Sequence, residues 1–414
     1  MGLSSLEIHR TIEAVWRIEA ARLTGGLARY VRDLGLAEDL AQDALVAALE
    51  QWPQEGIPDN PGAWLMATAK HRAVDTMRRR RLADSKHEQL GRELELDRAA
   101  AGLDDRPGDD LLTLLFATCH PLLSTEARAA LTLRLFGGLT TAEIARAFLV
   151  RETTISQRIV RAKRTLAEAR VPIAIPAGDE LAERLGSVLE VIYLIFNEGY
   201  AASAGDDWIR PELCEDALRV GRILAGLLPR EGEGHGLVAL MEIQASRSPA
   251  RIGPHGQPVL LLDQDRSRWD PVLINRGLEA LRRAEQLGPL GPYGLQAAIA
   301  ACHARARRAR DTEWERIVAL YDALAVVAPS PVVELNRAVA VSMAYGPEAG
   351  LELIDALGGE PLLSAYHLLP SVRGELLARL GRDAEARAEL ERAAAMAGNG
   401  SERRLLLERA AKLN

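Results

Sequence analysis

Polar side chains able to read and grip a DNA duplex are concentrated in residues 151–165 of the sequence. An arginine can form paired hydrogen bonds with guanine and a glutamine with adenine, while further cations bind phosphates. Gathered on one exposed surface, these residue types have the chemistry of a major-groove reader. The side chains expected to point outward are Thr154, Gln157, Arg158, Arg161, Arg164 and Thr165.

Two short helices must position these side chains. Thr140 and Glu143 stand at the spacing of a capping box, which predicts a helix start. After a break at residues 149–152, a second helix follows with one buried apolar stripe. Two helices joined by a tight turn, the second presenting Arg, Gln and Thr, have the form of a helix-turn-helix. The alternative is an ordinary helical hairpin with a solvated basic face. The predicted stripe consists of Ile155, Ile159, Ala162 and Leu166.

A second basic element lies upstream, in a helix predicted from Ala63 to about Leu82. Its apolar first half is followed by four consecutive arginines at 78–81. Because successive residues point in all directions around a helix, these arginines cannot all be buried. They form either a solvated helix end, which the helix dipole favours, or a phosphate-contacting patch. The residues support both interpretations equally.

A third element, residues 37–49, has the pattern of an amphipathic helix. Its core stripe is predicted to be Leu40, Ala44, Ala47 and Ala48. Its opposite face is small, acidic and polar, and consists of Glu38, Asp39, Gln42 and Asp43.

Composition and charge indicate a helical protein with an unevenly distributed charge. Apolar residues make up 48% of the 414 residues and aromatic residues only 4%, so Ala and Leu must provide most of the packing, which favours helices. The net charge of −7 argues by itself against nucleic-acid binding. However, residues 111–170 carry 9 basic and 4 acidic groups, whereas residues 83–110 carry 4 and 9, and residues 171–414 carry 27 and 34. Positive charge is therefore concentrated around the predicted helix-turn-helix.

The sequence offers no sign of a membrane or secreted protein. No apolar run approaches the roughly 20 residues that cross a bilayer, and the first residues lack the pattern of a signal peptide. The three cysteines are far apart and form no CxxC pair, which fits a reducing compartment. We therefore expect a cytoplasmic protein without a cysteine zinc site.

Taken in order, the three elements resemble the signatures of extracytoplasmic-function RNA polymerase sigma factors. AEDLAQDALVAALEQW resembles the polymerase-clamp helix, PGAWLMATAKHRAVDTMRRRR the −10 helix, and the helix-turn-helix the −35 module. The resemblance implies that Glu38, Asp39, Gln42 and Asp43 bind polymerase. It implies −10 contacts by Trp64, Lys70, His71, Arg72, Asp75, Arg78, Arg79, Arg80 and Arg81, with His71 standing where the family usually has Asn. It implies −35 contacts by Arg151, Thr154, Gln157, Arg158, Arg161 and Arg164.

Beyond these modules the chain continues for about 240 residues after a proline-marked boundary at 172–176. A helical middle domain is predicted at 177–290 and helical-hairpin repeats at 291–414, with turns at Gly346 and Gly381 about 35 residues apart. Residues 259–262 could form a short strand. The charged segment 263–270 is interpreted as a structural salt-bridge cluster rather than a metal-binding DxD motif. The whole chain resembles the sigma factor subgroup that carries a C-terminal tetratricopeptide-like extension.

We therefore expect an all-α chain with two small sigma domains, 1–82 and 111–172, joined by an acidic flexible linker at 83–110 and followed by the extension. The resemblance implies a non-enzymatic transcription initiation factor that binds core RNA polymerase and promoter DNA, has no catalytic residue, cofactor or metal, and is controlled in cis by the extension. A protein or peptide is expected to bind the tetratricopeptide-like part. One alternative is a stand-alone helix-turn-helix regulator with a protein-interaction domain; another is an enzyme or scaffold carried by the C-terminal half.

Overall fold

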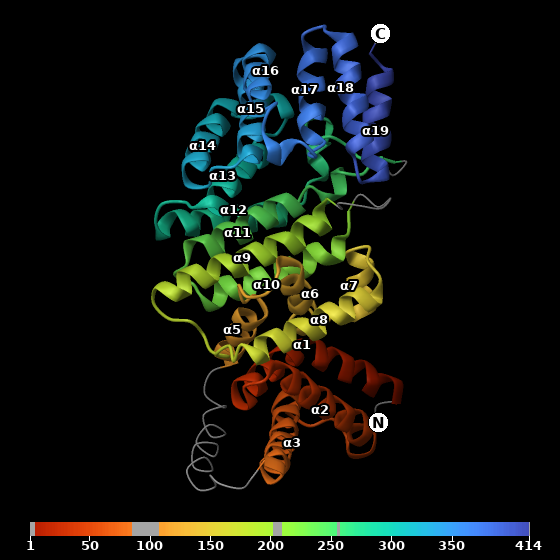
Figure 1. Cartoon of the computed structure of the whole chain (residues 1–414), viewed down its shortest axis with the longest axis vertical. Coiled ribbons are helices and arrows are strands. Elements are labelled where there is room, and N and C mark those ends of the chain that lie inside the picture. Colours follow the sequence, from red (N-terminus) through yellow and green to blue (C-terminus); the bar gives the residue numbers. More distant parts are fainter. Residues whose placement is uncertain (1–4, 85–106, 202–208, 255–256, 414) are drawn as a thin grey trace. The chain divides into compact units, whose positions relative to one another are not determined.

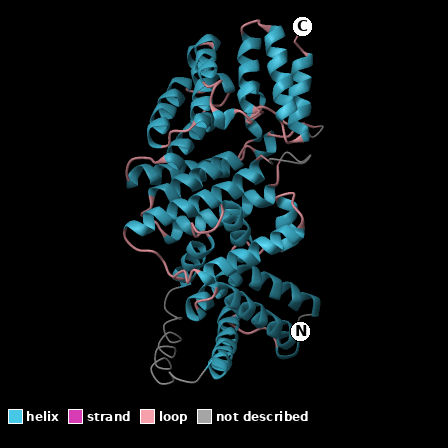
Figure 2. Ribbon diagram, in the orientation of Figure 1, coloured by secondary structure: helices cyan, strands magenta, loops and turns pink. Residues whose placement is uncertain are grey.

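The computed structural model describes residues 5–84, 107–201, 209–254 and 257–413. Over these residues the fold consists of helices, short 3-10 turns and loops, and no strand is present in them (Figure 2). The all-α expectation is therefore confirmed. The chain divides into two compact units, residues 1–192 and 193–414.

The first unit begins with three long helices that correspond to the first predicted domain (Figure 1). They are α1 (Ser5–Val31), α2 (Leu34–Glu55) and α3 (Pro61–Asp84). The Asp33 side chain caps α2 by accepting a hydrogen bond from the Leu36 amide, and the predicted alanine-rich stripe of α2 is buried. Small side chains let the neighbouring helices approach closely, and Trp52 fills the space at the end of α2 at 2% exposure.

The second part of this unit contains four shorter helices. These are α5 (Pro107–Thr118), α6 (Thr125–Leu135), α7 (Thr141–Ala147) and α8 (Glu152–Glu168). Since α5 begins at Pro107, the last residues of the predicted linker are helical; the rest of that linker, residues 85–106, lies outside the described residues. The prediction of a flexible linker is not tested there.

Helix α9 (Asp179–Tyr200) runs across the division between the two units. Within the first unit, its N-terminal half makes hydrogen bonds to the end of α5 and to the residue that follows it, and an ion pair with α6. Arg184 donates a hydrogen bond to the Phe116 carbonyl at 2.8 Å, and Ser187 donates one to the Cys119 carbonyl at 2.7 Å. The first helix of the extension is thus packed onto the helix-turn-helix module, although the prolines at 172 and 176 had suggested a boundary before it.

The second unit contains the remaining helices. They are α10 (Pro211–Leu227), α11 (Gly232–Ala245), α12 (Pro271–Leu287), α13 (Pro292–Arg305), α14 (Trp314–Val327), α15 (Pro331–Tyr345), α16 (Pro347–Ala356), α17 (Leu368–Arg379), α18 (Asp383–Met396) and α19 (Gly400–Ala411). Residues 259–262 do not form the predicted strand. That segment has only an isolated bridge between Ile252 and Pro258 and a 3-10 turn at Leu261–Asp263, because no neighbouring strand offers a ladder of backbone partners.

From α13 onward the helices form successive hairpins. Gly346 and Gly381, at φ +107° and +72°, make the predicted turns between α15 and α16 and between α17 and α18. Apolar clusters join each hairpin to the next: one links α13, α14 and α15, and another links α15 to α18. A core shared between neighbours in this way is the packing of a helical repeat array.

Candidate nucleic-acid interface

The helix-turn-helix has the local structure that its sequence predicts. Thr140 caps α7 by accepting from the Glu143 amide, while the Glu143 side chain accepts from the Thr140 amide, so the capping box is complete. These hydrogen bonds lower the pKa of Glu143, which keeps its carboxylate charged at the positive end of the helix. Leu149, at φ +51°, makes the turn that leads into α8.

The second helix buries one face and exposes the other. The predicted stripe on α8 is buried in full. Of the residues predicted to contact the −35 element, Arg158 is half-buried, and those that are exposed are Arg151, Thr154, Gln157, Arg161 and Arg164. Thr154, Gln157 and Arg161 line a hollow of about 350 Å³ together with the loop at 122–124. Arg164 forms an ion pair with Glu168 one turn further on.

The α3 helix presents its predicted contact residues less uniformly. His71, Asp75, Arg78 and Arg79 are exposed, while Lys70 and Arg72 are half-buried. Trp64 packs edge-on against Trp52, with the ring centroids 5.4 Å apart, so part of its surface is used in the fold. Arg80 and Arg81 continue the helix, but their side chains lie outside the described set.

The acidic face of α2 differs from its prediction at one residue. Asp39 and Asp43 are exposed and Gln42 is half-buried, whereas Glu38 is 8% exposed. The Glu38 carboxylate forms an ion pair with Arg134 of α6 at 3.1 Å and another with Lys163 of α8. The prediction that Glu38 belongs to an exposed polymerase-binding face is therefore wrong for this conformation, because two cations from the helix-turn-helix module cover it.

A second ion pair joins the same two modules. Arg29 of α1 bonds Asp110 of α5 at 2.9 Å, and Asp110 is almost fully buried. Burial raises the pKa of Asp110, and the neighbouring Arg29 opposes that rise. Helices α1 and α5 also come very close at Gly25, where a Cβ atom would lie 2.1 Å from the Asp110 carbonyl oxygen.

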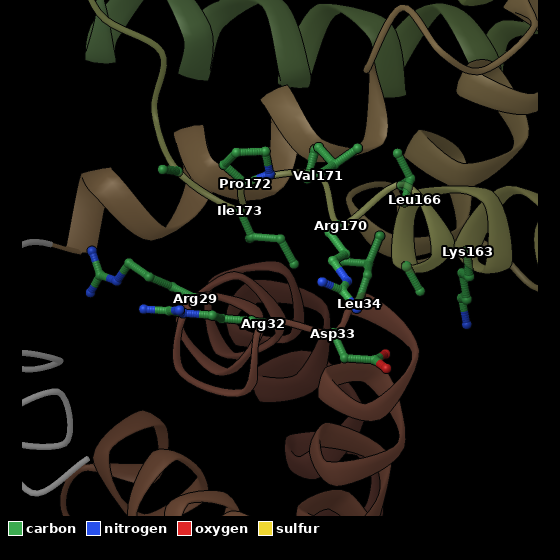
Figure 3. A pocket seen from close by; sticks show the side chains of 13 residues that line it. Arg29, Arg32, Asp33, Leu34, Lys163, Leu166, Arg170, Val171, Pro172 and Ile173 are labelled. Carbon is green, nitrogen blue, oxygen red and sulfur yellow. The ribbon is translucent and has the colours of Figure 1, made fainter. Parts of the chain in front are cut away.

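A cavity of about 580 Å³ interrupts the contact between the modules (Figure 3). The end of α1 lies on one side and the end of α8 with residues 170–174 on the other. Its lining includes four cationic side chains, Arg29, Arg32, Lys163 and Arg170. The modules therefore meet through the packing of α1 on α5, where apolar side chains of both helices are buried, and through ion pairs, with this cavity beside them.

Cys119, Cys214 and Cys302 are buried free thiols, and burial raises the pKa of Cys119 to about 11 and that of Cys214 to about 12. Such thiols stay protonated and unreactive at neutral pH. No helix in the described part of the chain is both long and apolar enough to cross a membrane.

Comparison with known families agrees with this architecture of a DNA-binding helical protein. Residues 17–83 match sigma-70 region 2, residues 113–166 match sigma-70 region 4, and residues 184–285 match a family of unknown function, DUF6596. The chain belongs to the sigma factor family.

Two kinds of relative are found. An uncharacterized protein, R00370, of Rhizobium meliloti (strain 1021) is 45% identical over 385 residues, covering 91% of this chain and 90% of the relative. The ECF RNA polymerase sigma factor SigK of Mycobacterium tuberculosis (strain H37Rv) is 30% identical over 159 residues, covering 35% of this chain and 78% of SigK. SigK of Mycobacterium ulcerans (strain Agy99) is 29% identical over 151 residues, with the same coverage. The likeness to R00370 extends through the long C-terminal part, whereas the likeness to SigK covers about a third of the chain.

Proposed function

We propose that this chain is a non-enzymatic sigma factor of the extracytoplasmic-function type. It binds core RNA polymerase through the exposed acids of α2, −10 promoter DNA through α3, and −35 DNA through α8. The observation that carries this proposal is the exposed Arg, Gln and Thr surface of α8. This helix packs through its buried stripe and follows the capped helix α7, inside the region 4 match. The region 2 match over α1 to α3 supports polymerase binding in addition to DNA binding.

Charge reversal on α2 tests the polymerase contact against a stand-alone regulator. Asp39→Lys/Asp43→Lys should weaken binding of the full chain to core RNA polymerase by roughly 100-fold, because two attractive contacts become repulsive. Folding should be little affected, since Asp43 forms only an exposed ion pair with Arg72 at 3.6 Å. Glu55→Lys, at the exposed end of the same helix, is the matched control. Unchanged polymerase binding in the double variant would favour a regulator that acts without polymerase.

The contact between the two modules supports a closed resting form. The −10 and −35 elements lie about 25 base pairs apart, which is roughly 85 Å along B-DNA. Helix α3 packs on α2, and α2 is joined to α8 by the ion pair between Glu38 and Lys163, so a single helix links the two DNA-binding helices in this form. Promoter binding therefore requires the modules to separate, and the 22 residues between α3 and α5, if fully extended, could span roughly 75 Å.

We propose further that the extension restrains this opening and that its hairpins, as a tetratricopeptide-like array, receive a protein or peptide signal. Two observations support restraint: residues 171–414 carry a net acidic charge opposite to the basic 111–170 segment, and α9 is bonded to α5 and α6. Arg184→Ala should weaken this docking by about 1–3 kcal/mol, because the Phe116 carbonyl loses its charged donor.

In transcription with core polymerase, full-length Arg184→Ala should give several-fold more promoter-dependent transcript than the wild-type chain. Glu183→Ala, an exposed neighbour on α9, should behave as the wild type. A decrease in transcript for Arg184→Ala alone would mean that the docked extension activates rather than restrains.

A further inference from the structure

Three arginines and two aromatic rings form a continuous cluster in the second unit. The Arg251 guanidinium lies 3.6 Å from the centroid of the Tyr200 ring, and that of Arg247 lies 5.6 Å from it. The Arg247 guanidinium also lies 5.9 Å from the centroid of the Trp269 ring. The Arg266 guanidinium lies 5.0 Å from the centroid of that same ring. Residues far apart in the sequence, from α9 to the 3-10 turn at Arg266–Arg268, thus bring three positive charges together. We refer to Tyr200, Arg247, Arg251, Arg266 and Trp269 as the arginine cluster.

Two acidic residues next to Arg266 and Trp269 in the sequence are engaged in capping. Asp265 accepts from the backbone and hydroxyl of Ser267, and Asp270 caps α12 by accepting from the Val272 and Leu273 amides. The predicted salt-bridge cluster at 263–270 is therefore wrong: the carboxylates of Asp265 and Asp270 cap helical turns, and Arg266 donates hydrogen bonds to the carbonyls of His303 and Ala306.

Arg247 has a buried positive charge that no carboxylate in the described residues pairs with. It is 8% exposed, and no hydrogen bond or ion pair reaches its guanidinium within the described residues; its Nε atom is buried without a partner. A buried charge without a counter-charge costs several kcal/mol. Cation–π contacts with two rings offset only part of this, since each contributes about 0.5–2 kcal/mol.

Further unused donors surround the same place. The Trp269 indole Nε1 and the Arg266 Nε are buried without acceptors, and His303, whose carbonyl binds Arg266, has an unpartnered Nδ1. Burial and then the nearby Arg247 and Arg266 lower the pKa of His303 to about 3, so its ring is neutral and adds no charge. Several unpartnered polar atoms beside the buried guanidinium of Arg247 define an environment suited to an acceptor-rich anion.

We propose that the arginine cluster is a binding site for the oxyanion group, phosphate or carboxylate, of a small-molecule effector. Arg247 supplies the unpaired charge, Tyr200 and Trp269 make cation–π contacts with the guanidinium groups, and Arg251 and Arg266 strengthen the local positive potential. The site lies within the 184–285 segment that matches a family of unknown function, except for His303. It gives the extension a place to receive a small anion in addition to any protein signal.

Thermal unfolding of the full chain in inorganic phosphate, with chloride of equal ionic strength as reference, tests this directly. At a concentration about 100 times the dissociation constant, phosphate should raise the unfolding midpoint of the wild-type second unit by on the order of 5–10 °C. Acetate, titrated in parallel, shows whether the site prefers a carboxylate. Arg247→Met should lose the response to both anions and, in chloride, should be at least as stable as the wild type, because it removes a buried charge.

Arg268→Met is the matched control, since Arg268 is exposed in the same 3-10 turn and should leave the anion response intact. General stabilisation by phosphate would raise all three midpoints equally and would overturn the proposal. An Arg247→Met chain that is less stable in chloride and still responds to phosphate would make Arg247 a structural residue. The absence of any response in the wild type would also overturn the proposal, and would mean that the chain neutralises the cluster itself.

Discussion

Replacing Gly25 by alanine should open the first unit and strengthen its binding to core RNA polymerase by about tenfold or more. In the closed form a Cβ at this position would lie 2.1 Å from the Asp110 carbonyl oxygen and 3.3 Å from the Leu114 Cβ. The Asp110 backbone cannot move aside as a flexible side chain can. The packing of α1 against α5 in the closed form should therefore be destabilised by about 1–3 kcal/mol. Once the modules separate, alanine is the better helix former by about 1 kcal/mol, so the open form gains.

Opening can be observed separately from polymerase binding. Dyes on cysteines introduced at the exposed positions 49 and 160 should show less energy transfer in Gly25→Ala than in the wild type. Gly186→Ala is the control, because nothing lies within 4 Å of a Cβ there. Lys163→Met, which removes a cation from Glu38, should shift energy transfer in the same direction as Gly25→Ala. If Gly25→Ala weakens polymerase binding without changing energy transfer, the closed form is not a resting state.

Reversing the charge of Arg161 should abolish recognition of −35 DNA, with a loss of at least 100-fold in affinity. Arg161 is exposed on α8 beside Thr154 and Gln157 and lines the same hollow. A good side-chain contact to a base contributes about 1–3 kcal/mol of discrimination, and a glutamate adds repulsion from the phosphates. The stripe that packs α8 is untouched, so the helix itself should remain folded.

The control for net charge is Arg310→Glu, at an exposed position of the second unit. The measurement is DNA binding as a function of salt, for the full chain on a promoter fragment and on an unrelated fragment. Arg161→Glu should remove the difference between the two fragments, whereas Arg310→Glu should keep it. An undiminished preference for promoter DNA in Arg161→Glu would show that α8 is not the reading helix.

Local patterns in the sequence predicted the helix-turn-helix well. The capping box at Thr140 and Glu143 and the buried stripe of α8 depend on residues three or four positions apart, so the chain itself carries the information. The same holds for the turns at Gly346 and Gly381, where φ is positive.

Features that depend on distant residues were not predictable in this way. Glu38 has the pattern of an exposed acid, and it is buried only because Arg134 and Lys163, 96 and 125 residues further along, cover it. Likewise, the arginine cluster unites α9 with a turn near residue 266, and the local charge pattern there suggested salt bridges. The Gly25–Gly26 pair was the one local signal of a close helix contact at α1, since glycine inside a helix has a cost that close packing can offset.

Run-off transcription shows whether this chain directs core RNA polymerase to promoters. Purified core polymerase should be incubated with genomic fragments, with and without the full chain, and with the Gly25→Ala chain as the form expected to be more active. We expect discrete transcripts that appear only when the chain is added and that increase with Gly25→Ala. DNA binding without any such transcript, from either form of the chain, would contradict it.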